Sequence, residues 1–194
     1  MTHSTIVRTG GLVVALLALL VATPALADAP TDKADASQAA VDDSDKAFEQ
    51  MLRGIDTLPD SQALEDRWPD VTQRLADVAT DTDASDYKRW RATGFLGEFD
   101  EPAAQKAVVE LTDDPQPYIR AQAYYVLGTT FVGADDDELF ELLVEGLDDD
   151  ESAVHRRVVL SLGWTDHPRT TEVLEEIAHK DEKLSDYAQR SLDR

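Results

Sequence analysis

Side chains that commonly carry out chemistry are few in this sequence, and their spacing matches no familiar catalytic pattern. The chain has no cysteine and four histidines in 194 residues, which excludes a cysteine nucleophile, an iron–sulfur centre and a disulfide scaffold. None of His155, His167 and His179 is followed directly by a glutamate, and the H-E-x-x-H spacing that places metal ligands on one helix face is absent. No G-x-S-x-G, Walker or dinucleotide-binding motif is present. We therefore expect no catalytic residues, no metal and no cofactor, and we expect that the protein is not an enzyme.

Carboxylates are the most abundant chemical groups. The chain has 40 acidic and 18 basic residues, a net charge of -22, and this excess excludes general nucleic-acid binding. Acidic clusters at 81–86, 135–137 and 148–150 offer the oxygen ligands that Ca²⁺ prefers. The first cluster lacks the glycine and the final glutamate of a calcium loop, with Ala92 in the last position. We expect solvated, helix-capping turns, with a calcium-responsive acidic surface as an alternative; the excess of aspartate over lysine is also typical of halophilic proteins.

Three windows of the sequence are free of acid and rich in aromatic and arginine side chains. They are Tyr87–Gly97, Tyr118–Gly128 and Ala153–Gly163. Aromatic and arginine residues anchor most protein interfaces, so these windows indicate a surface for a protein or peptide partner. The alternative is that their arginines pair with the acidic turns and tie neighbouring elements together, and Arg89 and Arg120 fit that role. The predicted partner-binding residues are Tyr87, Trp90, Arg91, Tyr118, Gln122, Tyr125, Arg156 and Arg157.

The same windows align with one another without a gap, and a fainter fourth copy covers 184–193. Each window has helical periodicity, follows an acidic turn, and alternates with another predicted helix, at 102–111, 136–147 and 168–178. A small residue lets a neighbouring helix approach, a leucine fills the core, and a glycine accepts the positive φ that often ends a helix. These structural positions are Arg89, Ala92, Leu96, Gly97, Arg120, Ala123, Leu127, Gly128, Val158, Leu162 and Gly163, with His155 in the arginine column.

The pattern apolar-Arg-x-x-Ala-x-x-x-Leu-Gly after an acidic turn resembles the short HEAT repeat of the phycobilin-lyase-like subgroup, an armadillo-type fold. The resemblance implies an all-α solenoid of about three and a half to four helix pairs over 85–194, with 46–84 as N-terminal helices that form a degenerate repeat or a cap. It also places the windows on the concave face. HEAT-like deoxyhypusine hydroxylases need His–Glu pairs for a di-iron site, which this chain lacks, so that activity is not expected.

The N-terminus has the pattern of an export signal. An apolar run at 11–22 precedes Ala25-Leu26-Ala27, is shorter than a membrane-spanning helix, and predicts cleavage between Ala27 and Asp28. We therefore expect a signal peptide at 1–27, transient membrane contact only, and a periplasmic or extracellular location. Six aspartates and no large apolar residue except Val41 predict a disordered acidic linker at 28–45.

Taken together, the patterns predict an exported, non-catalytic protein-binding or assembly module that uses the concave face of a short HEAT-like solenoid. The alternative is an enzyme or cofactor handler of the bilin-lyase-like or metal-dependent class, which the resemblance to the repeat leaves open.

Overall fold

The computed structural model describes residues 32–54 and 60–194, and these residues are helical, without a strand. The predicted signal peptide lies outside the described residues. None of the helices within the described ranges is both long enough and apolar enough to span a bilayer. The chain divides into two compact units, one ending at Asp43 and the other covering Ser44–Arg194, and the helix α1 (Asp32–Arg53) begins in the first unit and ends in the second.

The acidic segment differs from its expected disorder, because the structure describes residues 32–45 as part of α1. Alanines at 34, 36, 39 and 40 are the best helix formers. Asp32 and Asp35 lie near the helix N-terminus, where negative charge is favourable. The helix has 22 residues, longer than the roughly 12–15 residues below which an isolated helix is marginal. Low hydrophobicity alone was therefore a poor guide to disorder here.

The second unit starts with a small cluster formed by the end of α1 and by α2 (Ser61–Arg67). Phe48 and Trp68 meet edge to face with ring centroids 5.3 Å apart, and the Trp68 indole donates a hydrogen bond to Ser44 Oγ at 3.0 Å. Arg74 of the next helix pairs with Asp45 at 2.7 Å. These contacts bury apolar surface at the start of the unit, as a capping element must.

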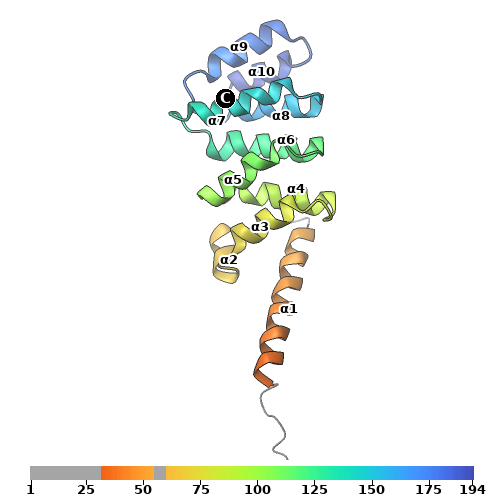
Figure 1. The fold of residues 1–194 in the computed structure, drawn as a ribbon. Coiled ribbons are helices and arrows are strands. Elements are labelled where there is room, and N and C mark those ends of the chain that lie inside the picture. The colour runs from red at the N-terminus through yellow and green to blue at the C-terminus, as the bar shows by residue number, and fades with distance from the viewer. Residues whose placement is uncertain (1–31, 55–59) are drawn as a thin grey trace, which may run out of the picture. The chain divides into compact units, whose positions relative to one another are not determined.

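The remaining helices form two layers of alternating elements (Figure 1). The first helix of each pair belongs to one layer: α3 (Val71–Thr80), α5 (Pro102–Leu111), α7 (Asp137–Glu145) and α9 (Thr170–Lys180). The second belongs to the other: α4 (Asp86–Leu96), α6 (Pro117–Val126), α8 (Ser152–Leu162) and α10 (Ser185–Leu192). A π-helical turn (Leu127–Phe131) extends α6, and a 3₁₀ turn (Gly146–Asp148) follows α7.

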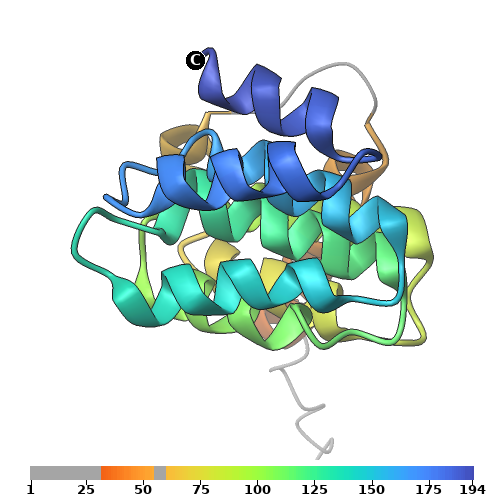
Figure 2. The same ribbon diagram turned by 90° about the horizontal axis from the view of Figure 1, so that it is seen from above.

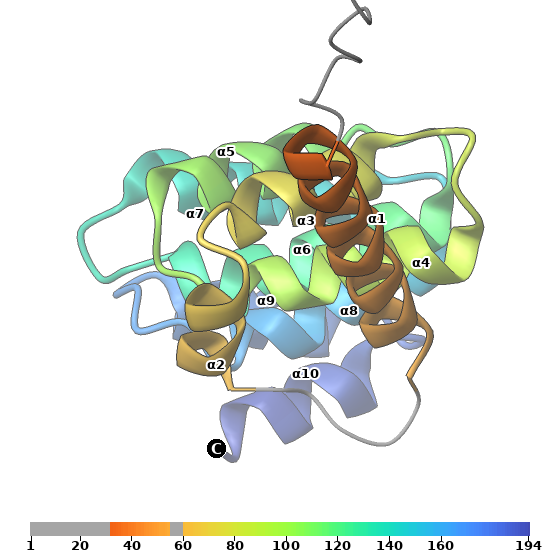
Figure 3. The ribbon, with the colours of Figure 1, turned by 90° about the horizontal axis from the view of Figure 1, so that it is seen from below.

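Successive pairs stack on one another, so that α4 packs against α6, α6 against α8 and α8 against α10. Figure 2 looks down on this stack from the α9–α10 end, and Figure 3 shows α5 and α7 on one side with α8 and α10 on the other. The predicted all-α solenoid is therefore confirmed for the described residues.

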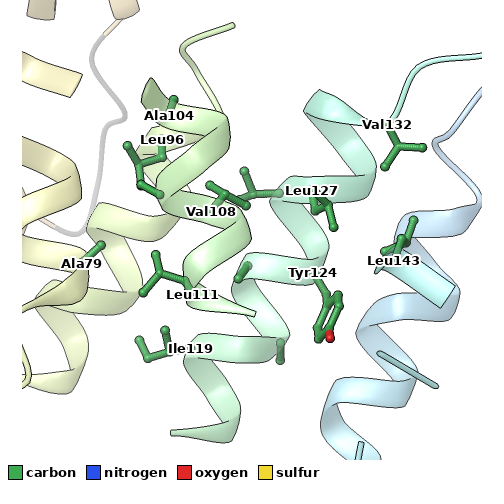
Figure 4. Packing of buried hydrophobic residues seen from close by; sticks show 14 of the residues in the cluster. Ala79, Leu96, Ala104, Val108, Leu111, Ile119, Tyr124, Leu127, Val132 and Leu143 are labelled. Carbon is green, nitrogen blue, oxygen red and sulfur yellow. The ribbon is translucent and has the colours of Figure 1, made fainter. Parts of the chain in front are cut away.

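The core lies between the two layers. The leucine column and the small-residue column are fully buried, with 0% exposure of Leu96, Leu127, Leu162, Ala92 and Ala123. Figure 4 shows how side chains from successive elements, such as Ala79, Leu111 and Ile119, interdigitate along the stack. Burial of this apolar surface is the main stabilising contribution to the fold.

The glycine column does not have the predicted positive φ. Gly97 and Gly163 have φ values of −70° and −66°, within the helical region. A Cβ atom at Gly128 would lie 2.8 Å from Ser161 Cβ, and one at Gly163 would lie 2.7 Å from Ser191 Cβ. Gly97 and Gly163 still end α4 and α8, but with helical φ values, and each glycine also allows the second helix of the next repeat to approach closely.

One acidic turn caps a helix as predicted, because Asp136 at the N-cap of α7 accepts a hydrogen bond from the Leu139 N–H at 3.0 Å. The turns before the second helices act differently. Asp114, Asp149 and Asp181 each accept a hydrogen bond from the backbone N–H two residues later, at 2.8 Å. The N-cap positions of α4, α6 and α8 make no side-chain cap hydrogen bond. The aspartates therefore form Asx turns before the repeated helices, and their other oxygens remain available to side chains.

Candidate functional site

The arginine column joins consecutive repeats. Arg89 is 2% exposed, forms an ion pair with Asp114 of the next acidic turn, and donates from Nε to the Ala79 carbonyl at 3.0 Å. Arg120 contacts both carboxylate oxygens of Asp149, at 2.6 and 2.9 Å. We call this set of contacts, together with the glycine contacts described above, the seam. It gives Arg89 and Arg120 the tying role that the sequence left open as an alternative.

The seam shifts the pKa of one carboxylate, and its series of ion pairs ends at His155. The hydrogen bond from Arg120 lowers the pKa of Asp149 below its ordinary value, against the opposing effect of burial. His155, which takes the arginine position in the next repeat, contacts the Asp149 backbone carbonyl through Nε2 instead of reaching forward to the following turn. The ladder of forward ion pairs therefore contains Arg89 and Arg120 and stops at His155.

A groove of about 400 Å³ crosses the second helices of four repeats. None of its described lining residues is acidic, although the chain has 40 acidic residues. Two tyrosines and a tryptophan form walls, two alanines leave the hollow, and two arginines and a glutamine supply polar groups. The lining residues are Trp90, Tyr118, Ala121, Gln122, Ala153, Arg156, Arg157, Leu160 and Tyr187.

Five of the predicted partner-binding residues meet in this groove: Trp90, Tyr118, Gln122, Arg156 and Arg157. They come from α4, α6 and α8, whose close packing brings distant parts of the sequence together. Burial raises the pKa of Tyr118 to about 12, and the Asp86 carboxylate acts in the same direction. The Tyr118 hydroxyl therefore keeps its proton at physiological pH.

The other three predicted residues lie beside the groove without lining it. Tyr87 is 44% exposed and stacks on Trp90 with ring centroids 6.5 Å apart. The Arg157 guanidinium lies 4.7 Å from the Tyr125 ring centroid, so Tyr125 supports a groove arginine. Arg91 stacks on Phe95 at 5.0 Å, and its buried Nε and one terminal nitrogen have no hydrogen-bond partner among the described residues.

Sequence reasoning missed Ala121, Ala153, Leu160 and Tyr187. The signal was present in the alignment of the repeats, because every groove residue falls at the first, fourth, fifth or eighth position of its window. These positions form one helix face. Tyr187 of the faint fourth copy shares a column with Gln122 and Arg157. The alanines were overlooked because a hollow is made by short side chains, which carry no chemistry of their own.

The remaining candidate residues have structural contacts. His167 is 3% exposed, stacks on Phe140 at 3.9 Å and contacts Asp137 through Nε2 at 3.0 Å. His179 contacts the Glu175 carbonyl at 2.7 Å. An acidic hollow between the turns at 113–115 and 148–150 contains Arg120. Within the described ranges, no three histidine or acidic side chains gather so that they could hold a metal ion.

Comparison with known proteins adds one structural likeness. No protein-family model and no curated protein sequence matches the chain. The structure is similar to that of human deoxyhypusine hydroxylase in complex with glycerol, with a TM-score of 0.52 and 21% sequence identity. The likeness covers 63% of this chain and 42% of the hydroxylase. It supports a HEAT-like helical solenoid, and at this identity it shows the fold alone.

This likeness contradicts the expectation that the protein is not an enzyme, because an enzyme is built on the same fold. The expectation rested on the lack of linear motifs. In a stack of repeats, residues far apart in sequence meet on one face, so an active site there needs no linear motif. The His–Glu pairs that a di-iron centre requires are absent from the sequence, and the described residues do not fit such a centre.

Proposed function

We propose that the protein binds a segment of a partner protein in the groove formed by α4, α6, α8 and α10. The observation that carries the proposal is the gathering of aromatic side chains and arginines, without a lining carboxylate, on a chain of net charge -22. Buried aromatic and arginine anchors dominate the binding energy of most interfaces. Binding of this kind is a step that a binding module and an enzyme acting on proteins both require.

The stacking of the helices supports the assignment of this face as the concave one. The second helices pack directly on one another from α4 to α10, whereas of the first helices described, α3 and α5 alone pack closely together. A stack whose layers are unequally spaced curves toward the closer layer. The finer proposal for the repeat type is the phycobilin-lyase-like HEAT subgroup, supported by the arginine and glycine columns that form the seam.

The groove is tested by comparing the proteins that bind to matched variants. The full chain, the double variant Trp90→Ala/Tyr187→Ala and the control Trp164→Ala are used as bait in the envelope or secreted fraction of the native source. Trp164 is 55% exposed and does not line the groove, so it controls for the loss of an exposed aromatic. The captured protein is then purified and titrated against each bait. Binding that the double variant loses and the control keeps supports the proposal, whereas equal binding by all three contradicts it.

A second candidate function is an enzyme of the metal-dependent or cofactor-handling class. The likeness to human deoxyhypusine hydroxylase favours this candidate. Elemental analysis and an absorption spectrum of the purified full chain test it. A stoichiometric metal or a bound chromophore would support the candidate. Protein that binds its partner in the groove and contains neither would contradict it.

We also propose export. The apolar run at 11–22 and the Ala25-Leu26-Ala27 sequence support cleavage before Asp28. The mass of the protein isolated from its source tests this proposal, because cleavage predicts a chain that starts at Asp28. An intact N-terminus in the mature protein would contradict it.

A further inference from the structure

The groove contains a polar side chain, Gln122, that forms no hydrogen bond with the described part of the protein. Gln122 is 7% exposed, and its side chain lines the groove. Its amide nitrogen packs against Gly94 of α4, where an added Cβ would lie 3.1 Å away. The side chain makes no hydrogen bond with any described residue, and its amide atoms are not among the fully buried ones.

A carboxamide that opens into the groove without a protein partner is available to a ligand. A carboxamide offers an acceptor oxygen and a donor N–H side by side. A peptide group presents the complementary pair, provided that its own N–H and C=O are not already used in a helix. Gln122 is therefore suited to hold one peptide group of an extended segment.

The two groove arginines have no carboxylate partner among the described residues. Arg156 and Arg157 form no ion pair with the described residues, and the hydrogen bond from Arg156 to Ser152 Oγ is long, at 3.3 Å. Arg74, Arg89 and Arg120, in contrast, all contact carboxylates. Stacking on Tyr125 orients the Arg157 guanidinium. An oriented guanidinium with free N–H groups is suited to a carboxylate.

The rest of the groove suits an apolar side chain. Trp90 and Tyr187 stand on opposite ends of the row of second helices, and Leu160 with two alanines lies among the lining residues between them. A volume of about 400 Å³ accommodates one or two side chains. The shape therefore fits a short piece of chain.

Building on the proposed function, we infer that the occupant is an extended peptide segment with an acidic side chain next to an apolar one. Gln122 holds a peptide group, Arg156 and Arg157 bind the carboxylate, and the aromatic walls enclose the apolar side chain. The segment belongs to a partner protein. An alternative occupant is the chain's own acidic segment at 28–45, which has six aspartates.

The probe is a pair of synthetic hexapeptide pools, random except for one central position that is Glu in one pool and Gln in the other. The full chain is immobilised and the retained peptides are quantified. Charge-assisted hydrogen bonds predict roughly tenfold greater retention of the Glu pool. The double variant R156Q/R157Q loses this preference and retains both pools equally. The matched control R194Q removes one positive charge outside the groove and keeps the preference.

The role of Gln122 is tested with Q122M, which keeps the side-chain size and removes the amide. Retention of both pools falls roughly fivefold, and the preference for Glu stays, because the arginines remain. Peptides that are N-methylated on both sides of the central position lose binding to the full chain and not to Q122M. Equal effects of N-methylation on both proteins would overturn the role of Gln122.

The remaining outcomes separate this inference from the proposed function. Equal retention of the Glu and Gln pools by the full chain overturns the inference, while a groove-dependent partner in the capture experiment leaves the proposed function in place. If neither the retention of the peptide pools nor the capture of any protein depends on the groove, both the inference and the proposed function are wrong. A synthetic peptide of residues 28–45 is tested in the same way. If it binds in preference to the Glu pool and this binding requires the groove arginines, the occupant is a segment of the chain itself, and the assignment to a partner is overturned.

Discussion

The seam and the groove use the same amino acids on the same helices for different purposes. Arg89 in the seam is 2% exposed and pairs with Asp114. Arg157, on the same layer of helices, rests on an aromatic ring and faces no carboxylate in the described protein. The difference shows that the position of an arginine within the repeat determines its role. The third-position arginines, Arg89 and Arg120, face the acidic turns, whereas Arg156 and Arg157 at the fourth and fifth positions line the groove.

The largest expected effect comes from breaking the seam at Arg89. The variant Arg89→Met leaves the Asp114 carboxylate buried without its charge partner, and such losses cost about 3–5 kcal/mol. Urea unfolding monitored by circular dichroism measures the change. The double variant Arg89→Met/Asp114→Leu is the control, because removal of both leaves no unpaired charge. It is expected to recover part of the stability, since the Ala79 carbonyl and the Gln116 N–H still lose their side-chain partners. A loss below about 1 kcal/mol for Arg89→Met would place this pair among ordinary surface ion pairs.

A smaller loss is expected at Asp149, and it depends on pH. The variant Asp149→Asn weakens the two contacts with Arg120, and hydrogen bonds to charged groups contribute about 1.5–3 kcal/mol. Because the folded protein lowers the pKa of Asp149, this stability is present above the ordinary pKa of 3.8 and is lost as the pH falls through the lower folded-state value. Unfolding measured from pH 7 down to pH 3 in both proteins should show converging stabilities at the acid end. A difference that stays constant over this range would contradict the assignment.

The glycine column tests how much the close packing of neighbouring repeats in the seam contributes to stability. The variant Gly163→Ala places a methyl group 2.7 Å from Ser191 Cβ, and overpacking of this kind costs about 1–3 kcal/mol. Gly133→Ala is the matched control, because a Cβ there has no atom within 4 Å in the described structure. Thermal unfolding of the two variants should separate them clearly. Equal melting temperatures would show that the repeats move apart at little cost.

The sequence predicted the repeat, its columns and most of the groove, because each depends on periodicity within the chain. Leucine and alanine columns were correctly assigned to the core, and the arginine column was correctly recognised as a possible tie. Two details were assigned incorrectly. The glycines lack the positive φ, and Asp114, Asp149 and Asp181 bind the backbone N–H two residues later instead of capping a repeated helix. Both errors arose because local propensity suggests a helix end, whereas contacts between repeats determine the outcome.

The groove itself was less predictable than its individual residues. Ala121 and Ala153 shape it by being small, and Tyr187 lies in a repeat too degenerate to attract attention. The unsatisfied carboxamide of Gln122 could not be inferred from sequence, because a lack of partners is a property of the folded neighbourhood. The same applies to the helical conformation of residues 32–45, where alanine content outweighed low hydrophobicity.

The central claim is that the groove arginines serve binding, whereas the seam arginines serve stability. The most direct test measures both properties on one protein, the R156Q/R157Q variant, by urea unfolding and by retention of the Glu peptide pool. The account predicts a stability within about 0.5 kcal/mol of the parent, as for substitutions at a surface, together with loss of the preference for the Glu pool. A variant that loses as much stability as Arg89→Met while it retains the Glu pool like the parent would contradict the account.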